Sequence, residues 1–187
     1  MTENRPDAEP SFLKIDRYWF LTWTTYGSWL PGDGRGFTDS EHNQPSTPVA
    51  TPNAGLRKFA EQQMTGRPVV LSIKHADILL AQFQETVRFR DWLLIAVAIM
   101  QTHLHLVVGV TGDPEPSLVL GDLKSYGSQA LNRDIGRSPS GTWWTDLGSK
   151  RKLPDARSVE SAVAYVTTQE NPLLIWTRER GIVFRCD

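Results

Sequence analysis

Two histidines separated by one residue are the most distinctive chemically active group in this sequence. His103 and His105 lie within the apolar segment THLHLVVGV, residues 102–110, whose composition predicts a β-strand. Alternate residues of a strand point to the same face, so both imidazoles are expected on one face of a sheet. Two neutral imidazoles placed in this way can share one divalent metal ion. The alternative is a pair of half-exposed histidines at a sheet surface, and the pair alone leaves both interpretations open.

A second candidate group lies about sixty residues later, in the segment AYVTTQENP. The spacing of apolar residues predicts a helix that Ser158 caps and that runs to about Glu170. Tyr165 and Gln169 are four residues apart, so a helix places them on one shoulder of its apolar face. A phenol and an amide oxygen could then enter a site beside the sheet. The alternative is a boundary tyrosine that covers the core edge and a solvated glutamine.

Positive charge is concentrated between these two groups. The chain has a net charge of −1, but residues 124–157 contain seven Lys or Arg and three acids, a net charge of +4. A polycationic protein is therefore excluded, whereas a local basic patch for phosphates is not. The candidate DNA contacts are Lys124, Arg133, Lys150, Arg151 and Lys152.

The last three of these basic residues are predicted to form a loop beside two tryptophans. Trp143 and Trp144 could stack on bases while Lys150, Arg151 and Lys152 bind phosphates. A solvated loop next to core tryptophans explains the same residues, and the sequence does not choose between the two.

Composition and segment lengths exclude several classes of protein. With 187 residues, 40% of them apolar and seven of them tryptophan, the chain can bury a core, which excludes wholesale disorder. Cys186 is the single cysteine, so neither an internal disulfide nor a cysteine-based zinc site can form. The polar first ten residues lack the apolar stretch of a signal peptide. The longest apolar run, Trp92 to Met100, is too short to cross a membrane, and we expect a cytoplasmic protein.

The order of predicted elements indicates an α+β fold. Strands are predicted at 17–26, 92–100, 102–110, 142–147 and within 173–184, and helices at 56–64, 76–90, 117–134 (with Ser117 as its cap) and 158–170. A tight turn around Gln101 makes the two middle strands antiparallel. The expected fold is an antiparallel sheet flanked by helices. We expect a flexible tail at 1–14 and one domain at 15–187, with a Pro- and Gly-rich insertion at about 31–68.

A His-hydrophobic-His strand followed by a helix with one tyrosine and a glutamine four residues on resembles the HUH single-tyrosine transposases. These include the insertion-sequence-200-like enzymes and the REP-associated tyrosine transposases. The segments RYWFLTWTTYG, WLLIAVAIMQTHLHLVVGV and AYVTTQENP follow one another in the family's order. The resemblance covers roughly residues 17–30 and 70–175, and it implies a ferredoxin- or RRM-like HUH endonuclease fold.

The resemblance also implies roles for single residues. His103, His105 and Gln169 match the three metal ligands, and Tyr165 matches the nucleophile. The implied cofactor is a divalent metal, Mg²⁺ or Mn²⁺, and the implied partner is single-stranded or hairpin DNA. The tyrosine would attack a metal-polarised phosphodiester, leaving a 5′-phosphotyrosine and a free 3′-OH. Family members act as monomers or as dimers, so a homodimer is one possibility.

Two other functions are compatible with the same residues. The chain could be a catalytically inactive or domesticated nucleic-acid-binding protein that has kept the fold. It could instead be a metal-dependent nuclease in which water attacks and Tyr165 is structural. The insertion at 31–68 and the modest total charge depart from the compact, basic members of the family.

Overall fold

The computed structural model describes residues 14–30 and 53–186 of the chain. The predicted tail at 1–14, apart from Lys14, lies outside the described residues, as does the first part of the predicted insertion, up to residue 52. The remainder of that insertion contains the predicted short helix, which is α1.

The described residues form six strands and four helices. The strands are β1 (Arg17–Thr24), β2 (Leu93–Ile99), β3 (His103–Val110), β4 (Ser149–Leu153), β5 (Leu174–Thr177) and β6 (Gly181–Arg185). The helices are α1 (Ala54–Gln62), α2 (Ile73–Phe89), α3 (Pro116–Asp134) and α4 (Ala156–Thr167). The predicted strands at 17–26, 92–100 and 102–110 and the predicted helices are confirmed, with ends that differ by a few residues.

The six strands form one antiparallel sheet in the order β4-β1-β3-β2-β5-β6. The hairpin predicted around Gln101 joins β2 to β3. Apart from the additional helix α1 before α2, the elements from β1 to β4 follow the order β-α-β-β-α-β, which is the ferredoxin-like arrangement. The predicted α+β fold with an antiparallel sheet and flanking helices is confirmed.

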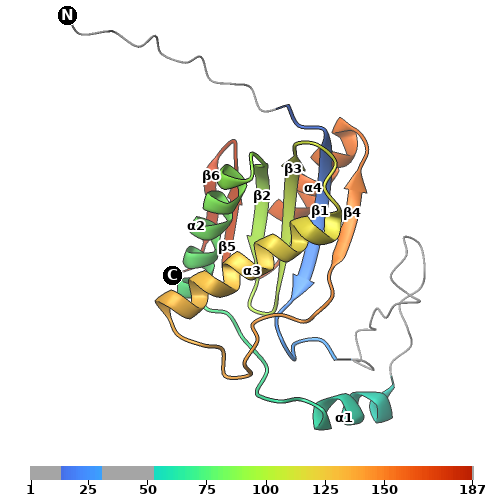
Figure 1. Ribbon diagram of the computed structural model, residues 1–187, viewed down its shortest axis with the longest axis vertical. Helices are drawn as coiled ribbons and strands as arrows, with labels where there is room; N and C mark the ends of the chain where they lie inside the picture. The colour runs from blue at the N-terminus through green and yellow to red at the C-terminus, as the bar shows by residue number, and fades with distance from the viewer. Residues whose placement is uncertain (1–13, 31–52, 187) are drawn as a thin grey trace, which may run out of the picture.

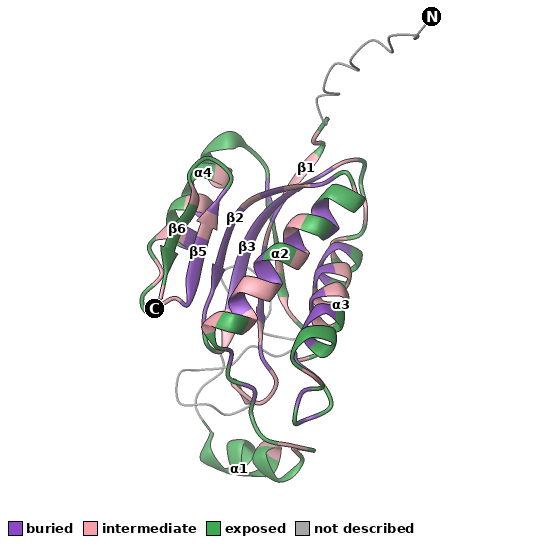
Figure 2. Ribbon diagram, turned by 90° about the vertical axis from the view of Figure 1, so that its left-hand side faces the viewer, coloured by how far each residue is buried: buried purple, intermediate pink, exposed green. Residues whose placement is uncertain are grey.

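Helices cover both faces of the sheet, as Figures 1 and 2 show. α2 and α3 lie on one face, whereas α4 lies on the other. β2, β3 and β5 are largely buried and appear mostly purple in Figure 2, whereas the outer strand β6 is exposed and appears green. The larger apolar core lies under α2 and α3, and a smaller one lies under α4.

The period-2 pattern of β1 explains how one strand serves both layers. Trp19, Leu21 and Trp23 are buried in the core under α2 and α3. The intervening residues point to the α4 side, and Phe20 packs there against the smaller core. A strand near the middle of the sheet therefore presents bulky apolar side chains to one layer and aromatic and hydroxyl side chains to the other.

The strand predicted at 142–147 is wrong, and so is the loop predicted at Lys150-Arg151-Lys152. Residues 142–147 are irregular, with a single bridge from Trp144 to Thr25, and the strand β4 follows at Ser149–Leu153. Trp143 and Trp144 are adjacent in sequence and are both buried in the core under α2 and α3. Consecutive strand residues point to opposite faces, so two such residues cannot share one core in a regular strand.

The predicted caps of α3 and α4 are also wrong. α3 begins at Pro116 with Glu115 before it, so Ser117 lies inside the helix. α4 begins after Asp155, whose side chain accepts a hydrogen bond from the backbone amide of Ser158. The amide of Ser158, in the first turn, has no hydrogen-bond partner within the helix, and Asp155 supplies one. The helix therefore starts upstream of the predicted position.

α1 lies at one end of the sheet (Figure 1). The segment after α1 passes beside Tyr26, which follows β1. The hydroxyl of Tyr26 accepts a hydrogen bond from the backbone amide of Thr65 at 2.8 Å. The backbone carbonyl of Tyr26 accepts a further bond from the amide of Val69 at 2.8 Å. None of the four helices in residues 14–30 and 53–186 combines the length and apolarity that crossing a membrane requires.

Substitution of Phe83 tests how much the core under α2 contributes to the stability of the protein. Its side chain is fully buried, and its ring meets that of Trp23 edge to face at a centroid distance of 5.9 Å. We expect Phe83→Ala to lower the free energy of unfolding by ~3–5 kcal/mol, because it removes apolar contacts and leaves a cavity. Urea denaturation measures this loss.

Phe89, on the same helix, provides the matched control. Its side chain is 73% exposed, so Phe89→Ala should change the free energy of unfolding by less than about 0.5 kcal/mol. Equal losses in the two variants would contradict the assigned orientation of α2.

Candidate functional site

The two histidines point to the α4 side of the sheet, as their spacing predicts. On β3, His103 pairs with Thr24 of β1, and His105 pairs with Thr22. The two imidazole centroids are 5.0 Å apart, with an angle of 79° between the rings. His105 is buried, with 6% of its surface exposed, and His103 is half-buried. The strand therefore places one imidazole inside the protein and the other at its edge.

Hydrogen bonds orient both rings. Nδ1 of His105 lies 2.8 Å from the hydroxyl of Thr22, and Nδ1 of His103 lies 3.2 Å from that of Thr102. Burial, together with the nearby His103, lowers the pKa of His105 to about 4. His105 is therefore neutral at neutral pH, and its Nε2 is the nitrogen left to accept a proton or a metal ion.

α4 brings Tyr165 to these histidines. Ala162 and Val166 of α4 are fully buried against the small residues Ala96 and Ala98 of β2, which allow the helix to lie close to the sheet. Tyr165 adjoins this apolar contact, and its ring centroid lies 5.3 Å from that of His105. Tyr165 is 49% exposed. It therefore contacts a buried imidazole on one side and is open to solvent on the other.

Phe20 of β1 joins three of the side chains at this site. Its ring is stacked on His105 at 5.6 Å with an angle of 11°, and it meets Tyr165 edge-on at 5.7 Å. The guanidinium of Arg151 lies 5.0 Å from the Phe20 ring centroid. Phe20 and Thr22 were not among the site residues predicted from the sequence. The alternation within residues 17–24 would place them on one face, but only the register of β1 against β3 brings them to His105.

Gln169 lies just outside the helix on which it was predicted. α4 ends at Thr167, and the side-chain amide of Gln169 donates a hydrogen bond to the backbone carbonyl of Tyr165 at 3.0 Å. This bond ties Gln169 to the carbonyl of the tyrosine and leaves its Oε1 as the atom able to ligate a cation. The structure thus joins Gln169 to the backbone of Tyr165, and the entry of both side chains into one site stays a prediction.

The donor set at this site fits a divalent metal ion. His103 and His105 share a face, and His105 is held neutral with one ring nitrogen available. Within the described residues there is no group of three or more His, Cys, Asp or Glu side chains that could hold a metal ion. A third protein ligand would have to be of another type. Gln169, the one expected from the sequence, has a suitable oxygen, but its described contact is with the Tyr165 carbonyl and not with either histidine, so its place in the donor set stays a prediction.

The five predicted DNA contacts do not gather in one place. Lys124 lies on α3, on the opposite face of the sheet, where its ammonium donates to the backbone carbonyls of Thr145 at 2.5 Å and Asp146 at 3.0 Å. Burial lowers its pKa. Arg133, also on α3, forms an ion pair with Asp134.

The remaining three predicted contacts, Lys150, Arg151 and Lys152, are consecutive residues of β4. Arg151 is the one that contacts the histidine and tyrosine side. Binding of DNA by these residues stays a prediction.

The tryptophans next to the basic strand are core residues. Trp143 and Trp144 are 5% and 4% exposed. Their indole N–H groups donate to the side chain of Asn132 at 2.9 Å and to the backbone carbonyl of Lys124 at 3.0 Å. Of the two interpretations open for these residues, burial favours core packing over base stacking.

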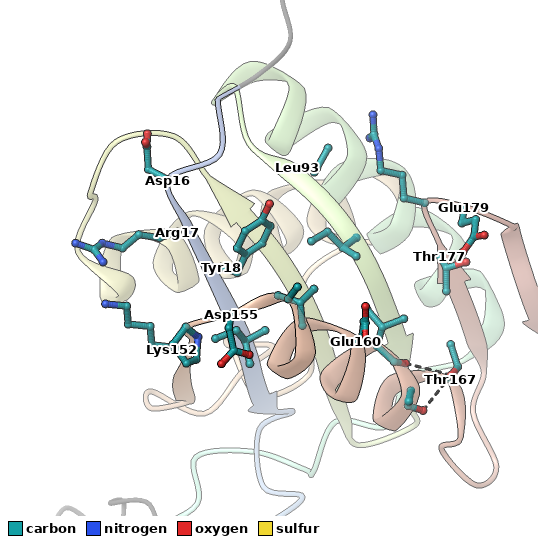
Figure 3. A pocket seen from close by; sticks show the side chains of 18 of the residues that line it. Asp16, Arg17, Tyr18, Leu93, Lys152, Asp155, Glu160, Thr167, Thr177 and Glu179 are labelled. Atoms are coloured by element: carbon teal, nitrogen blue, oxygen red, sulfur yellow. Dashed lines mark hydrogen bonds between the residues drawn. The ribbon is translucent and has the colours of Figure 1, made fainter.

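A groove of about 1160 Å³ lies along the other flank of α4 (Figure 3). Tyr18 and Leu93 line it from the sheet, and Glu160 and Thr167 line it from the helix. None of His103, His105, Tyr165 and Gln169 lines this groove. Its acidic and basic residues are equal in number, four of each, so it has no charge preference for a nucleic acid.

Two solved structures align with most of this chain. One is a REP-associated tyrosine transposase bound to a REP hairpin, with 13% identity, a TM-score of 0.46 and coverage of 89% of this chain and 71% of that chain. The other is a Deinococcus radiodurans R1 protein whose name proposes a transposase, with 14% identity, a TM-score of 0.47 and coverage of 91% and 99%. No protein-family model and no curated protein matches the chain. Identities this low leave the activity to be judged from the side chains of this protein.

The buried imidazole of His105 predicts how stability depends on pH. The folded-state pKa of about 4 lies below the ordinary value of 6.5, so the unfolded chain binds the proton more readily than the folded protein does. Stability is therefore fully present above about pH 6.5 and is lost as the pH falls toward 4. Without added metal, this histidine should lower the free energy of unfolding by ~2 kcal/mol between pH 7.5 and pH 5.

Urea denaturation of the wild-type protein and of His105→Asn, in the presence of a chelator, measures this contribution. The variant should lose less stability over the same pH range. Parallel pH profiles would contradict the assignment of the effect to His105. His75 is the second histidine whose pKa burial lowers, and it is present in both proteins, so its contribution cancels.

Proposed function

We propose that this protein is a metal-dependent, single-tyrosine enzyme that cuts and rejoins single-stranded DNA in the manner of a transposase. The observation that carries the proposal is the contact of the Tyr165 ring with His105 at 5.3 Å, with His103 a further 5.0 Å from His105. An exposed phenol beside two imidazoles that face the same way combines a nucleophile with ligands for a divalent cation.

Tyr165 is the nucleophile of the proposed reaction. Its Oη forms a bond with the phosphorus of a phosphodiester, and the bond between that phosphorus and the 3′ oxygen breaks. The phenolic proton passes to solvent, and the departing 3′ oxygen takes up a proton to become a 3′-OH. The 5′ end stays attached to Tyr165 as a phosphodiester, so a 3′-OH can later reverse the step and join strands. This conservation of the bond suits strand transfer better than hydrolysis.

His103, His105 and Gln169 would hold the cofactor, for which we propose Mg²⁺ or Mn²⁺. When bound, such an ion polarises the phosphodiester and offsets the charge that repels an anionic nucleophile. The hydroxyl of Thr22 fixes the ring of His105, and the side-chain amide of Gln169 is fixed by the Tyr165 carbonyl. The chain therefore orients its own donor atoms before a ligand arrives.

The proposed substrate is single-stranded DNA, and the ends that it joins are proposed to carry hairpins. The site is open, since Tyr165 is half-exposed, and the guanidinium of Arg151 lies at its edge, on the ring of Phe20. Lys124, Arg133, Lys150 and Lys152 are proposed as secondary contacts that steer the strand. Assembly as a homodimer and a cytoplasmic location belong to the same proposal.

Loss of the Tyr165 hydroxyl tests the proposed reaction. Mixing the wild-type protein with labelled single-stranded DNA and Mn²⁺ should give a covalent protein–DNA adduct on a denaturing gel. Tyr165→Phe should give none, because no other group replaces the phenolic oxygen. Tyr126→Phe, on α3, removes a phenol outside the site and should form the adduct at the wild-type rate.

Other outcomes of this experiment would overturn the proposal. Cleavage that survives Tyr165→Phe would show that water is the nucleophile and that the protein is a metal-dependent nuclease. Binding of DNA without cleavage by the wild-type protein would instead indicate a nucleic-acid-binding module that has kept the fold.

The hydrogen bond between Thr22 and His105 tests the metal assignment. Thr22→Val keeps the shape of the side chain and removes the hydroxyl, so the imidazole loses its orienting partner. We expect Mn²⁺ affinity to fall ~10- to 100-fold, which isothermal titration calorimetry measures. Thr142→Val, an isosteric change in an exposed residue away from the site, should leave the affinity unchanged. An unaltered Kd for Thr22→Val would show that His105 does not ligate through the ring held by Thr22.

A further inference from the structure

The three consecutive basic residues of β4 do not share a face of the sheet. Lys150 pairs with Leu21 and Lys152 with Trp19, and both of these β1 residues are buried under α2 and α3. Cross-strand partners point to the same side of a sheet, so this register directs both lysines toward that layer. Lys150 lies beside α3, whereas the side chain of Lys152, at the sheet edge, also lines the groove along α4, which contains neither of the histidines nor Tyr165. Arg151, between them, pairs with Phe20 and projects toward α4.

Arg151 is held in place by an aromatic platform. Its guanidinium lies 5.0 Å from the centroid of Phe20, whose ring also touches those of His105 and Tyr165. A guanidinium over an aromatic face gains a favourable cation–π interaction and keeps its N–H groups available at its rim. One ring therefore fixes a histidine, the tyrosine and a cation relative to one another.

No carboxylate among residues 14–30 and 53–186 neutralises the charge of Arg151 by forming an ion pair with it. Several other arginines do have such partners: Arg17 pairs with Asp113, and Arg90 pairs with Asp122. An unpaired cation beside a nucleophile is an arrangement suited to an anionic substrate.

Protection of the sheet edge is an alternative explanation for this arginine. β4 is an edge strand, and charged side chains on edge strands discourage pairing with another molecule. Lys150 and Lys152 already supply such charges to β4. Edge protection also does not require a cation to rest on a ring that contacts a tyrosine and a histidine, so it leaves the position of Arg151 unexplained.

We propose that Arg151 binds a non-bridging oxygen of the phosphodiester that Tyr165 attacks, whereas the lysines on either side of it do not reach the reacting group. This inference rests on the proposed function and adds a residue to it. A planar guanidinium bonds phosphate oxygens through two parallel N–H groups. It would stabilise the charge that builds on the phosphoryl group during the step.

Single-turnover kinetics at saturating DNA and Mn²⁺ test the proposal. Arg151→Gln should slow adduct formation ~100-fold, because a donor aimed at the developing charge is lost. Arg151→Lys, which keeps the charge but not the fork, should recover part of that rate. Arg180→Gln, an exposed arginine in the turn between β5 and β6, is the matched control and should react within about twofold of wild type.

A change of Phe20 separates the platform from the charge. Phe20→Leu keeps Arg151 and removes the ring on which it rests, and the same ring contacts His105 and Tyr165. The change is therefore made with and without Arg151, and it should slow the reaction less in the Arg151→Gln background than in wild type. Circular dichroism and the urea midpoint establish that each variant is folded. If Arg151→Gln raises the Kd for DNA and leaves the rate at saturation unchanged, Arg151 is an ordinary backbone contact and the proposal is overturned.

A binding measurement gives a readout independent of activity. In the Tyr165→Phe background, oligonucleotides with a neutral methylphosphonate at each linkage in turn are compared with the native strand. With a chelator in the buffer and Arg151 present, the methylphosphonate at one linkage, the one that wild type cleaves, should weaken binding ~10-fold, and Arg151→Gln should abolish this difference. A difference of the same size in both proteins overturns the inference even when the tyrosine chemistry holds. An adduct that persists in Tyr165→Phe refutes the proposed function by itself.

Discussion

The pairing of β1 with β3 is the constraint on which the candidate site depends. It places Thr22 opposite His105 and Thr24 opposite His103. A slip of one residue would turn Phe20 and Thr22 to the other face and bring Trp19, Leu21 and Trp23 out of their core. Burial of those large side chains therefore fixes the register. Burial of apolar side chains on the α2 and α3 side of β1 thus sets the position of the threonines on its α4 side.

The second constraint is the close approach of α4 to the sheet. Helix and sheet meet through Ala162 and Val166 on one side and Ala96 and Ala98 on the other. Small side chains permit a short separation, and larger ones would lift the helix and withdraw Tyr165 from His105. Because proteins pack at near-crystalline density, a change of one methylene at this contact is expected to reach the tyrosine.

The sequence was sufficient for those features that depend on local patterns. Alternation placed His103 and His105 on one face, and apolar spacing found the helix of Tyr165. The sequence was not sufficient for features whose position depends on tertiary contacts. The composition of residues 142–147 predicts a strand, yet the core takes Trp143 and Trp144 together and displaces the strand to 149–153. Phe20 could not be assigned to the site, because its neighbours on β3 and β4 depend on two registers that no local pattern encodes.

The site combines a rigid half with an accessible half, and the division follows from burial. His105 is 6% exposed on a central strand, where its pKa falls to about 4 and its ring is locked by Thr22. Tyr165 is 49% exposed in the last turn of α4, two residues before the helix ends. Helix ends open more readily than central strands. A metal ligand benefits from a fixed, neutral, desolvated ring, whereas a nucleophile that must meet a DNA strand and remain bonded to it needs access and some freedom. The strand and the helix terminus supply these two properties separately, and Phe20, in contact with both rings, keeps them aligned.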